Sequence, residues 1–320
     1  NINCDYMVGA QLAGFTTMVK LSEAPIIVLE GDEYLSSPID LRPKFHLYNP
    51  HIALISGIAW DHINVFPTYE NYLSQFEIFI NKIETNGYLT YCSSDDDLQK
   101  IAHVNTSICI ESYNLPSYTI ANGITSIEFE NTSIPLEIFG EHNLMNMMGA
   151  FNVCKQLDVL EIDFLNAMSS FKGASSRLEK IYERNGLQVF KDFAHSPSKV
   201  RASVKAVKDQ FIGFNIIAVL ELHTFSSLNK TFLSEYENTM DGIDTAIVYF
   251  DYLSLAHKKL ENLSEDLVFD CFARKGLKVI TNSNDVSNLV KSAISNNTIV
   301  LLMSSGDFGG LVLEELVESL

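Results

Sequence analysis

The stretch PIIVLEGDEY, residues 25–34, sets an apolar run directly against a cluster of carboxylates. Residues 26–29 are isoleucine, valine and leucine, a composition typical of a strand buried in a parallel sheet. Glu30, Asp32 and Glu33 follow at the carboxyl end of this run. Ligands of open parallel sheets bind beyond the carboxyl ends of the strands. The stretch therefore predicts a parallel strand and, directly after it, a position where chemistry is placed.

Short apolar runs alternate with helix-length segments along the rest of the chain. Strands are expected at 25–29, 52–58, 88–91, 107–110, 188–190, 216–220, 245–250, 277–280 and 299–303. Helices are expected over 68–83, 196–211 and 284–296, and one helical stretch over 143–171. Two alternating runs around Asn131 predict a hairpin. This order predicts an α/β fold whose mainly parallel sheets are covered by helices.

The length of 320 residues predicts two domains, because it is about twice that of a typical single domain. A polar break, FKGASSRLEK, interrupts the alternation at residues 171–180. We therefore expect one domain over 1–173 and a second over 174–320.

Charge and cysteine content narrow the class of function. The chain carries 40 acidic and 22 basic residues, a net charge of −18 that repels nucleic acid and anionic membrane surfaces. The five cysteines are scattered and never spaced as CxxC, which excludes a disulfide framework and a cysteine zinc site and favours a cytoplasmic location. No apolar stretch approaches the roughly 20 residues of a membrane span, and no signal peptide is recognisable. Small phosphorylated ligands stay possible.

A metal site is one interpretation of the carboxylates. The apolar run IALISGIAW, residues 52–60, ends in Asp61 and His62, so two neighbouring strand ends would bring Glu30, Asp61 and His62 together. Oxygen ligands beside a phosphorylated substrate favour Mg²⁺. The alternative is that these residues cap helices or lie in solvated turns.

The motif GEHNLMNMMGA, residues 140–150, offers polar groups at helical spacing. Asn143 and Asn146 would share a face, and together with His142 they can hydrogen-bond a planar base or a sugar. The alternative is that Asn143 is a helix N-cap and the neighbouring apolar residues form core.

These motifs together carry a family resemblance. EGDEY, WDHIN, GEHNLMN, SSRLE and DFAHSPSKV follow one another in the order found in the Mur ligases, the ATP-dependent amide-forming enzymes of peptidoglycan synthesis. The resemblance covers essentially the entire chain. It implies a central ATP-binding domain over 1–173 and a Rossmann-like C-terminal ligase domain over 174–320.

The resemblance also implies roles for individual residues, with ATP and Mg²⁺ as cofactors. Glu30 and His62 match magnesium ligands. Arg177 matches an arginine that contacts the terminal phosphate and, with the metal, would neutralise the repulsion between ATP and the acid. The positions that match adenine and ribose contacts are His142, Asn143, Asn146 and Asp192, and His195 lies near the same site.

The implied reaction converts a muramoyl carboxylate into an acyl phosphate, which an amine then attacks. Residues 26–68 look most like the recycling enzyme of the family, which joins UDP-N-acetylmuramate to L-alanyl-γ-D-glutamyl-meso-diaminopimelate. L-alanine is the competing acceptor, and a non-catalytic nucleotide-binding module is the alternative from another class. The residues do not predict an oligomeric state.

Three features depart from the family pattern or stay open. No Gly-Lys pair occurs, so the family's phosphate-binding loop is missing, and we expect an N-terminally truncated central domain. Glu77 lies about where some members carry a carbamylated lysine, although the same stretch fits an amphipathic helix. The loop Ser304, Ser305 and Gly306 would receive the carboxylate of the incoming amino compound, or it is an ordinary strand-to-helix turn.

We predict that the 320-residue chain by itself does not turn over ATP, because it lacks the lysine and glycine that hold the nucleotide phosphates. Phosphate release is measured with Mg-ATP, UDP-N-acetylmuramate and either acceptor, next to a Mur ligase of established activity as the positive control. Robust turnover by the chain would contradict the prediction.

Overall fold

The computed structural model describes residues 2–9, 15–60, 62–130 and 132–318, with Glu314 described by its backbone alone. The chain divides into two compact units, described separately below. The first comprises residues 1–117, 127–134 and 143–175, and the second comprises 118–126, 135–142 and 176–320. The sequence predicts a boundary near Gly173, and the division between the last long segments lies at Ser175 and Ser176.

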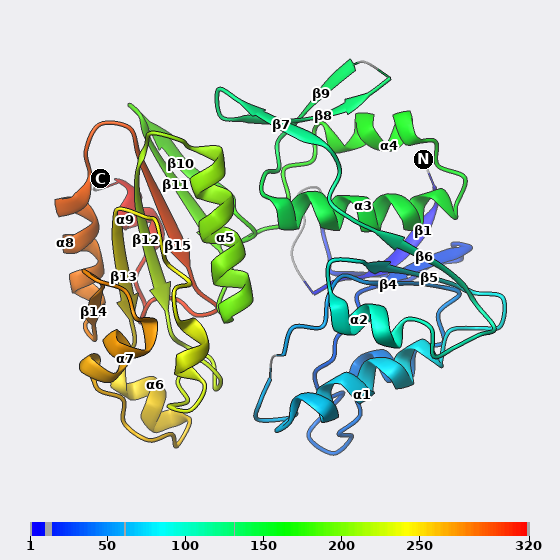
Figure 1. Ribbon diagram of the computed structural model, residues 1–320, viewed down its shortest axis with the longest axis horizontal. Coiled ribbons are helices and arrows are strands. Elements are labelled where there is room, and N and C mark those ends of the chain that lie inside the picture. The colour runs from blue at the N-terminus through cyan, green and yellow to red at the C-terminus, as the bar shows by residue number, and fades with distance from the viewer. Residues whose placement is uncertain (1, 10–14, 61, 131, 319–320) are drawn as a thin grey trace. The chain divides into compact units, whose positions relative to one another are not determined.

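The first unit is built on a parallel sheet in the order β4-β5-β6. Its strands are β4 (Ile52–Ile55), β5 (Tyr88–Cys92) and β6 (Cys109–Tyr113). Apolar side chains of α1 (Tyr69–Ile80) and α2 (Asp96–Ile101) pack with this sheet in one core (Figure 1). The expected strand 52–58 ends early because the N–H of Ile58 donates to the carboxylate of Asp95, at 2.8 Å, instead of to a neighbouring strand.

Helix α3 (Glu141–Lys155) packs against this sheet through small and polar residues. A Cβ atom on Gly149 would lie 2.8 Å from Leu54 and 2.9 Å from the ring of Tyr113, so the helix approaches the strands as closely as a glycine allows. The amide of Asn152 donates to the hydroxyl of Thr90 at 3.0 Å, and both residues are buried. A satisfied polar pair therefore anchors the helix within the core.

The predicted helical stretch over 143–171 is wrong as one helix. Helix α3 ends at Lys155, and α4 (Glu161–Met168) follows separately. Asp158 has a left-handed backbone with φ 59°, and the N–H of Val159 donates to the carbonyl of Cys154. This pattern is a Schellman ending, and an aspartate tolerates the left-handed position better than most residues.

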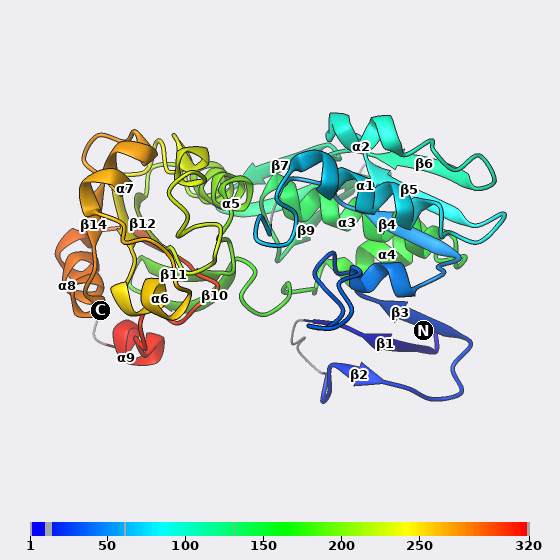
Figure 2. The ribbon, with the colours of Figure 1, turned by 90° about the horizontal axis from the view of Figure 1, so that it is seen from below.

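Two smaller sheets complete the strands outside the main sheets. Strands β1 (Cys4–Met7) and β3 (Ile26–Leu29) pair in parallel, and β2 (Val19–Lys20) pairs antiparallel with β1 (Figure 2). The expected strand over 25–29 is confirmed, but its burial is not, because Ile27 and Val28 are 46% and 51% exposed. The predicted hairpin is present within the sheet β7-β8-β9. Its strands are β7 (Tyr118–Ala121), β8 (Ile124–Phe129) and β9 (Thr132–Leu136), while Asn131 lies outside the described residues.

The second unit is a six-stranded sheet in the order β10-β11-β15-β12-β13-β14. Every pair is parallel except β10 with β11. The strands are β10 (Glu179–Arg184), β11 (Leu187–Asp192), β12 (Asn215–Glu221), β13 (Thr245–Tyr249), β14 (Lys278–Ile280) and β15 (Thr298–Met303). This architecture confirms the Rossmann-like α/β domain that the sequence predicts.

Helices cover both faces of this sheet (Figure 1). Helix α5 (Pro197–Gln210) lies on one face, and α8 (Ser283–Ala293) and α9 (Leu313–Glu318) pack on the other with the apolar core. The shorter helices of this unit are α6 (Tyr252–His257), α7 (Glu265–Phe272) and the 3₁₀ turn at Leu233–Tyr236. The first unit has one further 3₁₀ turn, at Lys44–Leu47, in its described part. Because β11, β15, β12 and β13 are parallel neighbours, their carboxyl ends meet at one edge. No helix within the described ranges is long and apolar enough to cross a membrane.

We predict that Asn152→Ala lowers the free energy of unfolding of the first unit by about 1–3 kcal/mol, because the buried Thr90 hydroxyl loses its partner. Trp60 is the single tryptophan of the chain and packs against the core of this unit, so its fluorescence during urea unfolding reports the loss. Asn166→Ala, an exposed change on α4, is the matched control and should be neutral within about 0.5 kcal/mol. Equal midpoints for the two variants would contradict the prediction.

Candidate functional site

Asp192 is the buried last residue of β11 and holds three parts of the second unit together. Its carboxylate accepts a hydrogen bond from the Leu178 N–H at 3.4 Å and another from the Ser203 hydroxyl. Its main-chain carbonyl accepts from the Ser304 N–H at 3.0 Å. The residue thereby connects the start of this unit, helix α5 and the loop after β15 at the carboxyl edge of the sheet.

Arg177 lies where the chain enters the second unit, in a constrained turn. Ser176 and Leu178 on either side have left-handed φ angles of 56° and 46°. The Ser176 carbonyl accepts from the Phe193 N–H at 2.8 Å, and the Arg177 guanidinium lies 4.9 Å above the Phe193 ring. No carboxylate forms an ion pair with Arg177 among the residues that the structure describes. A positioned cation with spare donors is suited to a phosphate group.

His195 and His142 lie at the same strand end. Nδ1 of His195 donates to the Phe193 carbonyl at 2.8 Å, which fixes the tautomer, and the residue is buried. Nδ1 of His142 is buried without a hydrogen-bond partner in the described part of the chain. Burial lowers the pKa of His142, the nearby Asp192 carboxylate raises it, and Arg177 lowers it. The structure therefore brings His142, Arg177, Asp192 and His195 together, and burial, which lowers the pKa of His142, favours its uncharged form.

Asn143 and Asn146 belong to the first unit. Helix α3 begins at Glu141, so Asn143 lies inside the first turn and is not the N-cap. Asn143 is half-buried and Asn146 is exposed.

The predicted metal ligands follow strands of two different sheets, so Glu30 and His62 are not at neighbouring strand ends of one sheet as predicted. The Glu30 carboxylate accepts from the Gly9 N–H at 2.5 Å. His62 lies in the left-handed region, with Nε2 3.5 Å from Glu33 Oε1 and its ring 5.0 Å from that of Tyr34. The sequence does not single out Glu33, although the same carboxylate cluster contains it.

The donor set of this region fits Mg²⁺ only in part. Its oxygens come from Glu30 and Glu33, and its imidazole from His62, a chemistry that Mg²⁺ accepts. No group of three or more His, Cys, Asp or Glu side chains is arranged to hold a metal among the described residues, and Asp61 lies outside them. Glu77 lies half-buried on α1, and its main-chain carbonyl accepts from the backbone and the side-chain amide of Asn81.

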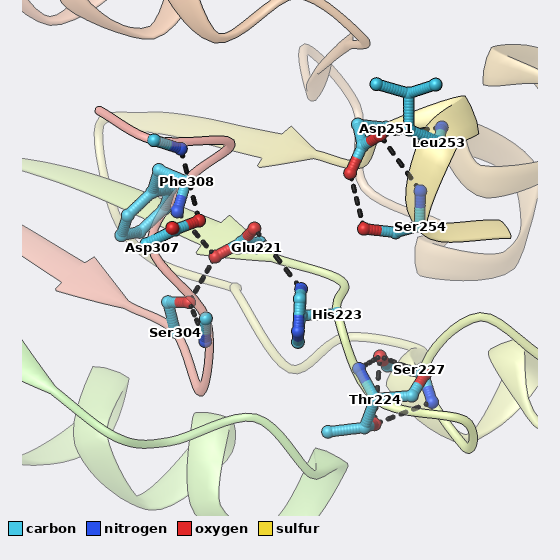
Figure 3. A network of polar contacts seen from close by, with 12 residues as sticks. Glu221, His223, Thr224, Ser227, Asp251, Leu253, Ser254, Ser304, Asp307 and Phe308 are labelled. Carbon is cyan, nitrogen blue, oxygen red and sulfur yellow. Dashed lines mark hydrogen bonds and ion pairs between the residues drawn. The ribbon is translucent and has the colours of Figure 1, made fainter. Parts of the chain in front are cut away.

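The loop after β15 is folded around a carboxylate of the protein itself (Figure 3). Glu221 Oε2 accepts from the Ser304 hydroxyl and from the Phe308 N–H, the latter at 2.8 Å. The Gly306 N–H donates to Ser304 Oγ at 2.7 Å, and Ser305 Oγ is buried without a partner in the described chain. Of the loop expected to receive a ligand carboxylate, the Ser304 and Gly306 N–H groups are therefore engaged, by the Asp192 carbonyl and by Ser304 Oγ. Glu221 is not among the site residues that the sequence predicts, although Glu221 follows an apolar run just as Glu30 does.

A cavity of about 260 Å³ opens between this loop and the end of β11. Lys191, Asp192 and Asp307 contribute charged groups to a wall that is otherwise largely apolar. The lining residues are Lys191, Asp192, Leu302, Ser304, Gly306, Asp307, Phe308, Leu311, Val312 and Leu313.

Both halves of the chain match models of known protein families. Residues 15–154 match the Mur ligase middle domain, and residues 176–306 match the Mur ligase, glutamate ligase domain. The UDP-N-acetylmuramate–L-alanine ligase of Caldicellulosiruptor bescii is 28% identical over 96% of this chain and 69% of its own length. That of Clostridium kluyveri is 26% identical over 96% of this chain and 68% of its length. The chain thus spans about two thirds of these relatives.

Solved structures share the fold. UDP-N-acetylmuramate–alanine ligase from Thermotoga maritima has a TM-score of 0.70 at 15% identity, covering 99% of this chain and 68% of that one. A murein peptide ligase from Psychrobacter arcticus has a TM-score of 0.65 at 16% identity, covering 99% and 71%. MurF ligase from Thermotoga maritima in complex with ADP has a TM-score of 0.71 at 20% identity, covering 94% and 69%.

The matched domains follow each other in the order that the motifs predict, and together they account for both units of the structure. The chain belongs to the Mur ligases, the ATP-dependent acid–amino-acid ligases of peptidoglycan synthesis, and carries their middle and C-terminal domains.

Proposed function

We propose that this protein joins the carboxyl group of UDP-N-acetylmuramate to the amino group of L-alanyl-γ-D-glutamyl-meso-diaminopimelate at the expense of ATP. The observation that carries the ATP-dependent step is the Asp192 cluster, in which a buried carboxylate, two histidines and an arginine without an ion-pair partner among the described residues meet at one strand end. The tripeptide acceptor rests on the resemblance of residues 26–68 to the recycling enzyme of the family. L-alanine is the second candidate, because curated relatives at 28% and 26% identity are named for it.

Arg177 is the group best suited to assist phosphoryl transfer. A free carboxylate is a poor acyl donor, so a phosphoryl group of ATP first activates it, and the two anions repel each other as they approach. The guanidinium, held over Phe193, would supply fixed positive charge where the negative charge of the two anions accumulates. Preorganisation matters here because a cation that must move into place stabilises the transition state less.

Asp192 and the two histidines are proposed to receive the nucleoside part of ATP. A buried carboxylate can accept hydrogen bonds from ribose hydroxyls, and His142 has a ring nitrogen without a partner in the described chain. His195 is held in one tautomer by the Phe193 carbonyl, which fixes the direction of its ring.

Glu30 and His62 of the first unit would hold Mg²⁺, with Glu33 as a further oxygen beside the imidazole. Because these side chains do not form a three-ligand group among the described residues, water and phosphate oxygens of ATP would have to complete the coordination. When bound, Mg²⁺ would neutralise phosphate charge and polarise the transferring group. The residues themselves provide acidic oxygens around the imidazole, with Glu33 Oε1 3.5 Å from His62 Nε2. In this proposal Glu33 joins the two ligands that the motif match assigns.

We predict that Asp192→Asn weakens ADP binding about tenfold or more, because a hydrogen bond to a charged acceptor is worth about 1.5–3 kcal/mol. Calorimetric titration of the 320-residue chain with ADP measures the dissociation constant, and circular dichroism verifies the fold. Asp285→Asn, an exposed change on α8, is the control with the same loss of charge. An unchanged affinity in a folded Asp192→Asn variant would refute the nucleotide role.

We also predict a preference for the tripeptide. The protein purified from its own cells is assayed with UDP-N-acetylmuramate, ATP and either acceptor, and the products are identified by mass spectrometry. We expect kcat/KM at least about 100-fold higher with the tripeptide, because a site built to bind its polar groups rejects a smaller analogue strongly. The reverse preference would establish L-alanine as the acceptor, and no product with either would refute the ligase proposal.

A further inference from the structure

Glu221 is a buried carboxylate outside the Asp192 cluster. It is the last residue of β12 and is 2% exposed. An ionised carboxylate is costly to bury unless several donors surround it. Glu221 Oε2 accepts from two donors, the Ser304 hydroxyl and the Phe308 N–H at 2.8 Å, and Nδ1 of His223 lies 3.7 Å from Oε1, beyond hydrogen-bond distance (Figure 3). Its charge is therefore the centre around which the loop after β15 is folded.

The turn over residues 304–308 is pressed closely onto this carboxylate. Ser304 donates to Glu221 and at the same time accepts from the Gly306 N–H at 2.7 Å, so the charge polarises both hydrogen bonds. A Cβ atom on Gly306 would lie 2.8 Å from His223 Nδ1 and 2.9 Å from Glu221 Oε2. Only a residue without a side chain fits against the pair without displacing it.

His223 is placed between two strand ends. Glu221 lies on one side, and Asp251, after β13, is close enough to interact with it electrostatically. Asp251 is itself fixed, because it caps α6 by accepting from the Leu253 and Ser254 N–H groups at 2.7 and 3.0 Å. The imidazole therefore lies near two carboxylates at the carboxyl ends of neighbouring parallel strands.

The clamped turn forms part of the cavity wall beside Lys191. Four of its residues line the cavity, namely Ser304, Gly306, Asp307 and Phe308, whereas Glu221 does not. Lys191 has no ion-pair partner in the described part of the chain, and Asp307 contributes a negative charge to the same cavity. The wall carries the cation of Lys191 and the carboxylates of Asp192 and Asp307, a combination that suits a compound with both an amino and a carboxylate group.

We propose that Glu221 is a positioning residue of this ligase. Its carboxylate fixes the 304–308 turn and His223 at the carboxyl edge of the sheet and so sets the shape of the cavity that receives the amine-bearing substrate. This inference rests on the proposed function for the identity of that substrate. The contact between Glu221 and the 304–308 turn, called the clamp below, does not depend on the proposed function.

The kinetic test compares Glu221→Ala with the conservative Glu221→Gln in the protein purified as its own cells produce it. The alanine variant should raise KM for the amine substrate about 100-fold, because the 304–308 turn that forms the cavity wall would shift by about 1 Å. KM for ATP should change less than about threefold. Glutamine keeps an oxygen for the Phe308 N–H and should restore KM to within about tenfold. Asp244→Asn is the matched control, since this carboxylate accepts from the Ile216 N–H at 2.8 Å at the opposite end of the strands.

A second readout is independent of catalysis. Hydrogen exchange of the Phe308 amide in the 320-residue chain should be slow, and about 100-fold faster in Glu221→Ala, because the amide loses its acceptor. Gly306→Ala should also accelerate hydrogen exchange of the Phe308 amide, and this variant replaces Glu221→Ala in the test if Glu221→Ala does not fold. Asp244→Asn should leave it unchanged.

The outcomes separate the two proposals. If the unaltered protein makes no amide product but the exchange of Phe308 responds as expected, the proposed function fails and the clamp stands. If Phe308 exchange is insensitive to Glu221, or if both KM values rise together in Glu221→Ala, the positioning role is overturned.

Discussion

Buried carboxylates at the carboxyl ends of parallel strands hold the second unit in its working arrangement. Where a parallel strand stops, the following backbone N–H groups lose their neighbours and need acceptors. Asp192 supplies them to the entry turn at Leu178, and Glu221 supplies them to the turn at Phe308. Both are almost completely buried, so each charge must remain surrounded by donors. The same two groups therefore stabilise the loops and fix the direction of every side chain that those loops carry.

Much of the fold follows from the sequence because its apolar runs are long and regular. The strands at the centre of the parallel sheets were all expected, and their observed limits differ by a few residues. The strands that the sequence does not reveal are β1, β2, β7 and β10. Strand β2 has two residues, and β10, EKIYER, lies at a sheet edge with a largely polar composition, so neither has the apolar pattern of a buried strand. The interruption at Asp158 is likewise hidden, because an aspartate carries no strong break signal.

The candidate site was predictable to a different degree in its two halves. Motif order indicates Arg177, Asp192 and His195. Asp192 and His195 lie at one strand-to-helix connection, and the antiparallel pairing of β10 with β11 brings Arg177 beside Phe193. The arrangement of Glu30 and His62 depends on which sheet each strand joins, and sheet order is set by packing between distant segments. Glu221 needed β15 to insert between β11 and β12 before its role could be recognised. Contacts of this kind are decided by topology, which no local pattern contains.

The charge distribution connects these features with the chemistry of the family. A chain of net charge −18 must bring an anionic nucleotide to an anionic acid, so its few well-placed cations matter more than their number suggests. Arg177 is placed by an aromatic ring instead of a carboxylate, and Lys191 lines a cavity without an ion-pair partner among the described residues. Neither side chain forms an ion pair within the described ranges, so both are placed to meet an anionic ligand. Several acidic residues, by contrast, accept hydrogen bonds from backbone N–H groups or pair with lysines, among them Asp192, Glu221, Asp32 and Glu111. Arg177 and Lys191 therefore allow an acidic protein to present positive charge to anionic ligands.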